Sequence, residues 1–235
     1  MNSLRARYDV VIAGGGIIGC FVAYFLKQRN PAMEVAVIEP DPAYEHASTV
    51  RASGGARRLF SCAENIEMSS FSIERIRNFA VEMAAGDEPA PIDWVEQGYL
   101  FIASGADAMR MLEENAHRQR SLGADIELLD RDGLKRLFAS MHVDDLDGAA
   151  FSPRDGWCGP NSFLQGTRNK AKSLGVAFVS DRVSGFAMSG GRIARASLAS
   201  GASLAADFFC QCRWPVGRSG KRRGGHVSAR GSQLL

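Results

Sequence analysis

The chain has 235 residues, of which 46% are apolar and 23% are charged, a composition typical of globular proteins and unlike that of disordered or fibrous chains. No apolar run reaches the roughly 20 residues that a membrane-spanning helix needs, and Met1–Arg7 lead into a strand without a signal peptide, so we expect a cytoplasmic protein without an integral membrane segment. The five cysteines are odd in number and scattered, which argues against a disulfide scaffold.

The formal net charge of +2 conceals two regions of opposite sign. Residues 1–207 contain all 26 acidic side chains and 22 of the 28 basic ones, a formal charge of −4. Residues 208–235 contain six basic side chains and no acidic one, a formal charge of +6. So sharp a change indicates a boundary near the C-terminus.

The first predicted elements are a strand, a glycine-rich turn, a helix and a second strand. The apolar strand covers 8–13 and leads into the turn Gly14-Gly15-Gly16-Ile17-Ile18-Gly19, which has the pattern G-x-G-x-x-G. A helix is predicted over 17–28, and a second apolar strand over 35–38 ends at Glu39. This order of elements is typical of a dinucleotide-binding unit.

Each of three glycines in such a unit has a physical role. Gly14 permits the tight turn, Gly16 lets the backbone approach a pyrophosphate, and Gly19 lets the helix pack closely on the strand. The pyrophosphate would lie on the free N–H groups and positive dipole end of the helix. Glu39 follows Gly19 by twenty residues, a spacing that suits a carboxylate accepting hydrogen bonds from an adenosine ribose.

The middle of the chain alternates helical and strand patterns. Helices are predicted over 63–82 and 106–122, with strands over 94–103 around a turn at Gln97-Gly98. A short strand over 126–129 is followed by a helix that Asp130 can cap. Residues 149–152 lead into the run Asp155-Gly156, and Pro160 suits the first turn of a helix that extends to Ser173.

Four strand patterns follow this last helix. The first covers 176–179, and the next three cover 183–188, 192–198 and 203–209. Turns at 189–191 and 200–201 make the last three an antiparallel meander. The sequence therefore predicts an α/β fold with a Rossmann-like, mostly parallel sheet that carries an antiparallel meander.

Several runs resemble the FAD-dependent oxidoreductases related to D-amino-acid oxidase, glycine oxidase and sarcosine oxidase. The likeness begins with residues 9–19 and Glu39, and continues with Ala47-Ser48-Thr49 and with residues 52–57, Ala-Ser-Gly-Gly-Ala-Arg. It extends through Asp155-Gly156, Pro160 and residues 175–209, so that it covers 8–209. The first motif is shared by many flavin and nicotinamide enzymes, whereas the Ser-Thr and Ser-Gly-Gly-x-Arg run is more particular to this family.

The resemblance implies FAD as the cofactor and a flavin domain assembled from discontinuous segments, with part of a sheet-based substrate domain between them. We expect the flavin domain over 1–88 and 149–209 and the partial substrate domain over 89–148. The resemblance further implies roles for residues outside the first motif: Ser48 and Thr49 near the pyrophosphate, Gly54 and Gly55 against the flavin ring, Arg57 near the flavin, and Val183 at the adenine.

Plainer interpretations stand beside these roles. Ser48 and Thr49 could cap a turn, Arg57 and Arg58 could be solvated surface charges, and Cys20 could be a small core residue. The chain has Cys158-Gly159 where the family commonly has an acidic residue before the proline, a departure that bears on the local turn.

The family's chemistry is hydride transfer from the carbon that bears an amine to the flavin. The resemblance therefore implies an oxidoreductase whose partner is a small amine or amino acid, such as glycine, sarcosine or a D-amino acid, with no nucleic-acid partner. The family's carboxylate-binding arginine and last flavin-binding segment lie beyond residue 209, so no catalytic residue is identified. A catalytically inactive flavin-fold fragment and a nicotinamide-binding Rossmann protein remain as alternatives.

Residues 210–235 differ from the rest of the chain. Cys210, Cys212 and His226 offer too few ligands for a metal site, and no metal is expected. Family members continue after Phe209 with Val-Asn-Ala-Ala-Gly-Pro-Trp, and codons for residues 210–219 can be chosen so that removal of the first base encodes that run. We therefore expect that this tail is translated out of frame and is disordered.

Overall fold

The computed structural model describes residues 5–212, and its backbone contacts divide the chain into two compact units. The first unit combines residues up to Arg51 with those from Phe163 onward, and the second unit is Ala52–Ser162. The division does not coincide with the predicted domain boundaries at 88 and 148. The reason is local packing, because Ile66 lies in one apolar cluster with Leu112 and so belongs to the second unit.

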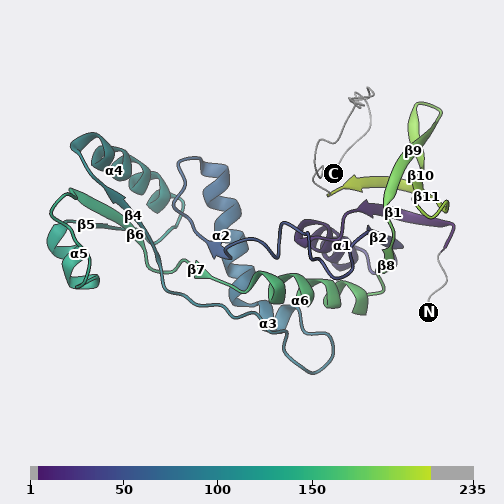
Figure 1. The fold of residues 1–235 in the computed structure, drawn as a ribbon, viewed down its shortest axis with the longest axis horizontal. Helices are drawn as coiled ribbons and strands as arrows, with labels where there is room; N and C mark the ends of the chain where they lie inside the picture. The colour runs from purple at the N-terminus through teal and green to yellow at the C-terminus, as the bar shows by residue number, and fades with distance from the viewer. Residues whose placement is uncertain (1–4, 213–235) are drawn as a thin grey trace. The chain divides into compact units, whose positions relative to one another are not determined.

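The first unit is built on a six-stranded mixed sheet in the order β8-β2-β1-β11-β10-β9 (Figure 1). The strands are β1 Arg7–Ala13, β2 Val35–Glu39, β8 Ala177–Ser180, β9 Val183–Ser189, β10 Arg192–Leu198 and β11 Ser203–Gln211. Strands β8, β2, β1 and β11 pair in parallel, whereas β9, β10 and β11 form the predicted antiparallel meander. The predicted α/β class is confirmed.

Both faces of this sheet are covered. Helix α1, Ile17–Arg29, follows β1, and helix α6, Pro160–Ser173, precedes β8. On one face Val10, Ile12 and Val37 pack with Ala23 of α1 and Ala171 of α6. On the other face Val11, Ala36 and Ile38 pack with apolar residues of the meander, Ala196, Leu198, Leu204 and Ala206. This two-sided burial explains why β1 and β2 are continuous apolar runs.

Strand β11 extends beyond the predicted strand. Cys210 and Gln211 are paired with Ile12 and Ala13 of β1, and the Cys212 amide donates to the Ala13 carbonyl at 2.9 Å. The prediction that a disordered tail begins at residue 210 is wrong for Cys210 and Gln211. Pairing with β1 satisfies the backbone N–H and C=O groups of both residues, and this pairing does not depend on the identity of their side chains. The remainder of that predicted tail, 213–235, lies outside the described residues.

The second unit contains a three-stranded antiparallel sheet in the order β4-β6-β5 and a short ribbon of two strands, β3 and β7. Its elements are β3 Gly55–Ala56, α2 Ala63–Arg77, α3 Phe79–Glu82, β4 Tyr99–Ala103, α4 Ala106–Ser121, β5 Glu127–Leu129, α5 Arg131–Leu137, β6 Gly148–Ser152 and β7 Gly156–Trp157. Helices α4 and α5 cover opposite faces of the sheet (Figure 1), since Ala150 packs with Leu112 and Ala149 packs with Leu134.

Three predictions in this unit meet different outcomes. The predicted helix over 63–82 is interrupted at Asn78, which separates α2 from α3. Of the two strands predicted around the turn at Gln97-Gly98, the second is present as β4 from Tyr99, whereas the first is reduced to an isolated antiparallel bridge between Val95 and Trp157. The predicted cap is confirmed, because Asp130 Oδ1 accepts a hydrogen bond from the Gly133 amide at 2.7 Å.

Two properties expected from composition can be compared with the structure. No helix within residues 5–212 combines the length and apolar character that crossing a membrane requires. All five cysteines are free thiols.

Candidate functional site

The glycine-rich turn lies where the parallel strands β1 and β2 end. The Gly14 amide donates to the Ile38 carbonyl at 2.9 Å, and Gly14 has a φ of +108°, a conformation that favours glycine. A Cβ atom at Gly19 would lie 1.9 Å from the Gly14 carbonyl oxygen. The tight turn and the close packing of helix on strand therefore both depend on glycine, as the sequence predicts.

Gly16 differs from Gly15 and Gly19 because the space beside its Cα has room for a further group. The heavy atom nearest to the position of a Cβ at Gly16 is Thr49 Oγ1, at 3.6 Å. Thr49 Oγ1 also accepts a hydrogen bond from the Ile17 amide at 3.2 Å, so Thr49 caps α1. The other first-turn amides have no partner within a helix, and no acidic side chain lies in this first turn. The end of α1 is thus suited to an anion.

Glu39 holds this turn directly. Its Oε2 accepts a hydrogen bond from the Gly15 amide at 2.7 Å, and its Oε1 accepts one from the Asp41 amide at 2.9 Å. A carboxylate has about four acceptor positions, so both oxygens retain capacity for ribose hydroxyls. The predicted ribose ligand therefore also shapes the turn that would bind the pyrophosphate.

The remaining predicted residues of the first unit lie around the same strand ends. The Asp181 amide donates to the Glu39 carbonyl at 3.2 Å, which brings the start of β9, and with it half-buried Val183, next to the end of β2. Ser48 is exposed. Cys20 is fully buried, and its Sγ donates to the Gly15 carbonyl at 3.1 Å, which confirms the interpretation of Cys20 as a core residue.

Gly54 and Gly55 lie in the second unit and are tightly surrounded there. Gly54 has a φ of +79°, and a Cβ atom on it would lie 2.1 Å from the Cys158 carbonyl oxygen. A Cβ atom on Gly55 would lie 2.2 Å from the Tyr99 hydroxyl. Packing within this unit alone accounts for both glycines, and their place beside a flavin ring stays a prediction.

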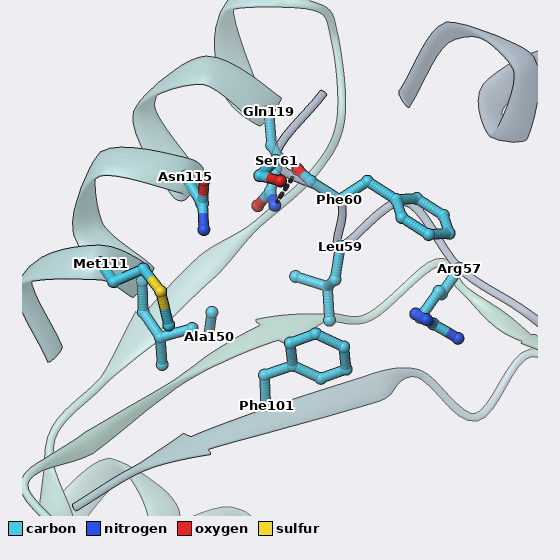
Figure 2. Close-up of a pocket in the computed structure, with 10 residues that line it drawn as sticks. Arg57, Leu59, Phe60, Ser61, Phe101, Met111, Asn115, Gln119 and Ala150 are labelled. Atoms are coloured by element: carbon cyan, nitrogen blue, oxygen red, sulfur yellow. Dashed lines mark hydrogen bonds between the residues drawn. The ribbon is translucent and has the colours of Figure 1, made fainter. Parts of the chain in front are cut away.

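Arg57 borders a cavity of about 280 Å³ in the second unit (Figure 2). Its guanidinium carbon lies 4.8 Å from the centre of the Phe60 ring and 5.6 Å from that of Phe101, within the range of cation–π attraction. Helix α4 contributes Met111, Asn115 and Gln119 to the lining, and Gln119 Nε2 donates to the Phe60 carbonyl at 2.8 Å. Arg57 is half-buried, and its role near a flavin stays a prediction.

Arg58 is a buried structural residue, so the interpretation of Arg58 as a solvated charge is wrong. It is only 6% exposed, and its Nη1 lies 2.8 Å from Oδ1 of Asp155, which is fully buried. The Arg58 amide also donates to Asp155 Oδ2 at 2.7 Å. Burial raises the pKa of Asp155, and the hydrogen bonds and charge of Arg58 oppose that rise. An alternating sequence pattern does not reveal such a pairing across 97 residues.

The start of α6 shows how the chain replaces the acidic residue that its sequence lacks before Pro160. Asp93, from a distant loop, accepts a hydrogen bond from Ser162 Oγ at 2.9 Å through Oδ2. The same oxygen lies 2.7 Å from the position that a Cβ at Gly159 would occupy. A carboxylate therefore stands beside the first turn of α6, where it complements the helix dipole.

Comparison with known proteins gives the family. Residues 9–212 match the model of the family described as FAD dependent oxidoreductase, and the chain belongs to this family. The chain is 41% identical over 175 residues to FAD-dependent oxidoreductase domain-containing protein 1 of Xenopus laevis, which covers 72% of this chain and 35% of that protein. It is 26% identical over 157 residues to mitochondrial sarcosine dehydrogenase of Homo sapiens, covering 67% of this chain and 16% of that protein.

Among solved structures, L-proline dehydrogenase from P. horikoshii superimposes with a TM-score of 0.79 at 23% identity, covering 88% of this chain and 53% of that one. This likeness confirms the fold. The chain spans about a third of the length of the Xenopus relative and about half of the dehydrogenase structure. Membership in the family implies FAD as the cofactor, as the sequence predicts.

Proposed function

We propose that the first unit binds FAD and that the protein oxidises a small amine or amino acid. The observation that carries the FAD site is the meeting of three features at the ends of β1 and β2: the open backbone at Gly16, the α1 N-terminus capped by Thr49, and the carboxylate of Glu39. An anion at the helix end and a ribose at the carboxylate correspond to the two halves of the ADP moiety.

Several residues of this chain would act on the bound cofactor. The first-turn amides of α1 would donate to the pyrophosphate, and Glu39 would accept from the ribose hydroxyls while it holds the Gly15 amide. Bound FAD supplies an acceptor for the hydride that leaves the carbon bearing the amine. Relatives matched by sequence are named sarcosine dehydrogenase and glycine oxidase, and this supports a substrate with a C–N bond next to a carboxylate.

The FAD site is tested by titrating the full chain with FAD and following quenching of flavin fluorescence. Gly16→Val places methyl groups where the pyrophosphate would approach, so we expect FAD affinity to fall by at least about tenfold, since several hydrogen bonds to a charged group are lost. The control is Gly185→Val in β9, where a Cβ atom meets nothing within 4 Å. Equal FAD affinity in Gly16→Val and the unchanged chain would contradict the site, and saturable NADH binding in its place would favour a nicotinamide protein.

The substrate class is tested separately with the FAD-loaded protein under anaerobic conditions. Glycine, sarcosine, L-proline and a D-amino acid are added in turn, and bleaching of the flavin absorbance reports hydride transfer. Bleaching by one of these amines, and not by the corresponding 2-hydroxy acids, is the expected result. FAD binding without bleaching by any amine would favour the catalytically inactive alternative for this chain.

The cytoplasmic location of the protein stays a prediction from the sequence.

A further inference from the structure

A tyrosine beneath the glycine-rich turn combines burial with an unusual backbone conformation. Tyr44 is 1% exposed and has a φ of +60°, in the left-handed region that residues other than glycine rarely occupy. Such a conformation persists only where the surrounding structure imposes it, and it concentrates at ligand clamps. We propose that Tyr44 is a positioning residue that holds Gly15, and through it the N-terminus of α1, in the geometry that receives the FAD pyrophosphate; this rests on the proposed FAD site.

The first support is contact between the side chain and the turn. The Tyr44 hydroxyl lies 3.2 Å from the position that a Cβ at Gly15 would occupy, and the Glu39 Cβ lies 3.0 Å from that position. The Gly15 amide donates a hydrogen bond to Glu39 Oε2, and the Gly15 carbonyl accepts a hydrogen bond from Cys20 Sγ. Gly15 is thus held by hydrogen bonds through its amide and its carbonyl. The Tyr44 hydroxyl occupies the space beside the Gly15 Cα where a side chain would otherwise lie.

The second support is the backbone path around Tyr44. The Tyr44 amide donates to the Asp41 carbonyl at 3.0 Å, and the Tyr44 carbonyl accepts from the Ala47 amide at 3.1 Å. Two consecutive turns therefore share Tyr44. They connect Glu39, which binds Gly15, with Thr49, which caps α1 at Ile17. The left-handed conformation lies at the junction of a segment that touches the glycine-rich turn at both of its ends.

The third support comes from Arg168 of α6. Its guanidinium carbon lies 5.6 Å from the centre of the Tyr44 ring and 5.4 Å from that of Phe178, so the cation contacts both rings. Burial raises the pKa of the Cys20 thiol to about 12, and the charge of Arg168 opposes this rise. Arg168 therefore places a positive charge against the Tyr44 ring, within the unit that contains the N-terminus of α1.

A tyrosine that only filled the core would affect stability and nothing else. Tyr44 is instead in contact with the backbone that would bind the cofactor, so its removal has a further consequence. Loss of the hydroxyl leaves a space beside Gly15, so Gly15 is held only by its two hydrogen bonds and the alignment of the α1 amides with the pyrophosphate is relaxed. The effect is confined to ligands that carry a pyrophosphate.

The experiment compares Tyr44→Phe with Tyr8→Phe in the full chain. Tyr8 is a matched control because it is 3% exposed and its hydroxyl accepts from the Arg5 amide at 3.2 Å, at the other end of β1 from the turn. The Tyr44 hydroxyl is buried without a hydrogen-bond partner within residues 5–212, so Tyr44→Phe removes only its packing against Gly15. We expect this loss to weaken FAD binding about threefold and Tyr8→Phe to leave FAD binding unchanged. The ratio of ADP to adenosine affinity should fall in Tyr44→Phe, because only ADP carries the pyrophosphate.

A second measurement does not depend on a bound ligand. In the ligand-free protein, amide hydrogen exchange at Gly15 and Ile17 should be about tenfold faster in Tyr44→Phe than in Tyr8→Phe, since local opening governs exchange at such sites. Wild-type exchange rates together with wild-type FAD and ADP affinities in Tyr44→Phe would overturn the proposal. Absence of FAD binding in the unchanged chain would instead contradict the proposed function, and the exchange rates would still decide whether Tyr44 holds the turn.

Discussion

The glycines of the glycine-rich turn look alike in the sequence, but their surroundings in the structure differ. Gly19 cannot accept a Cβ because the Gly14 carbonyl oxygen occupies that space at 1.9 Å. Gly16 could accept one, because only Thr49 Oγ1 lies within 4 Å, at 3.6 Å. The fold therefore requires glycine at position 19, whereas glycine at position 16 leaves space that a ligand can approach.

This difference predicts that the same substitution has a large effect on stability at Gly19 and almost none at Gly16. Gly19→Ala should lower the free energy of unfolding by about 2–4 kcal/mol, because the overlap with backbone forces α1 away from β1. Gly16→Ala should change it by less than about 0.5 kcal/mol. Chemical denaturation followed by circular dichroism measures both variants, and equal stability of the two would contradict the close packing at Gly19.

The pair of Arg58 and Asp155 gives a pH-dependent prediction. Because burial raises the folded-state pKa of Asp155, folding favours the protonated carboxyl, and the stability that this group contributes falls as the pH rises through that pKa. Arg58→Met removes the partner that opposes the shift, so the pKa rises further. We expect a loss of about 3–5 kcal/mol near neutral pH, the usual effect of leaving a buried charge unpaired.

The sign of the pH effect separates this explanation from a simple loss of packing. The destabilisation by Arg58→Met should be smaller at about pH 5 than at about pH 8, because protonation neutralises the unpaired carboxyl. Arg110→Met, at an exposed ion pair with Asp107, is the control and should change stability by less than about 1 kcal/mol at either pH. A destabilisation that does not vary with pH would mean that Asp155 is not the group responsible.

At the scale of elements, helix α1 depends on a cap that comes from outside its own sequence neighbourhood. Its N-cap residue, Gly16, has no side chain to make a cap, and Thr49 supplies the acceptor for Ile17 from 32 residues away. Thr49→Val keeps the shape and removes this acceptor. It should lower the free energy of unfolding by about 1 kcal/mol, and FAD affinity should fall as the helix end frays.

The control for this cap is the same substitution inside α6. Thr167 Oγ1 donates to the Phe163 carbonyl at 2.8 Å, and Thr167→Val removes that hydrogen bond without freeing a helix end. Thermal unfolding and FAD titration of both variants are compared. If Thr49→Val has no larger effect on FAD affinity than Thr167→Val, the cap has no part in cofactor binding.

At the scale of the whole molecule, the hypothesis about the reading frame can be tested directly. Removal of one base at codon 210 should open a reading frame that begins Val-Asn-Ala-Ala-Gly-Pro-Trp and continues well past codon 235. The protein from the altered frame should bind FAD more tightly than the present chain, as measured by flavin fluorescence. A stop codon within a few triplets of the altered frame would contradict the hypothesis.

Local patterns in the sequence were sufficient to predict the elements that pack on their own sequence neighbours. The patterns of the strand, turn and helix over residues 7–29, the cap at Asp130 and the meander of β9 to β11 could each be recognised from nearby residues, although Thr49 completes the cap of α1 from 32 residues away. The roles of Gly14 and Gly19 follow from the same local geometry. The family and its cofactor followed from these runs together with the Ser-Thr and Ser-Gly-Gly-x-Arg segment.

Only the tertiary structure decided the features that join distant parts of the chain. The pairing of β1 with β11, the burial of Arg58 against Asp155 and the contact of Arg168 with Tyr44 each connect segments more than 90 residues apart. A solvated arginine and a buried one look alike in a sequence, because the difference lies in the partner that folding supplies. The left-handed conformation of Tyr44 has the same origin, since Tyr44 packs in one cluster with Cys20 of α1 and Leu164 of α6, both distant in the sequence.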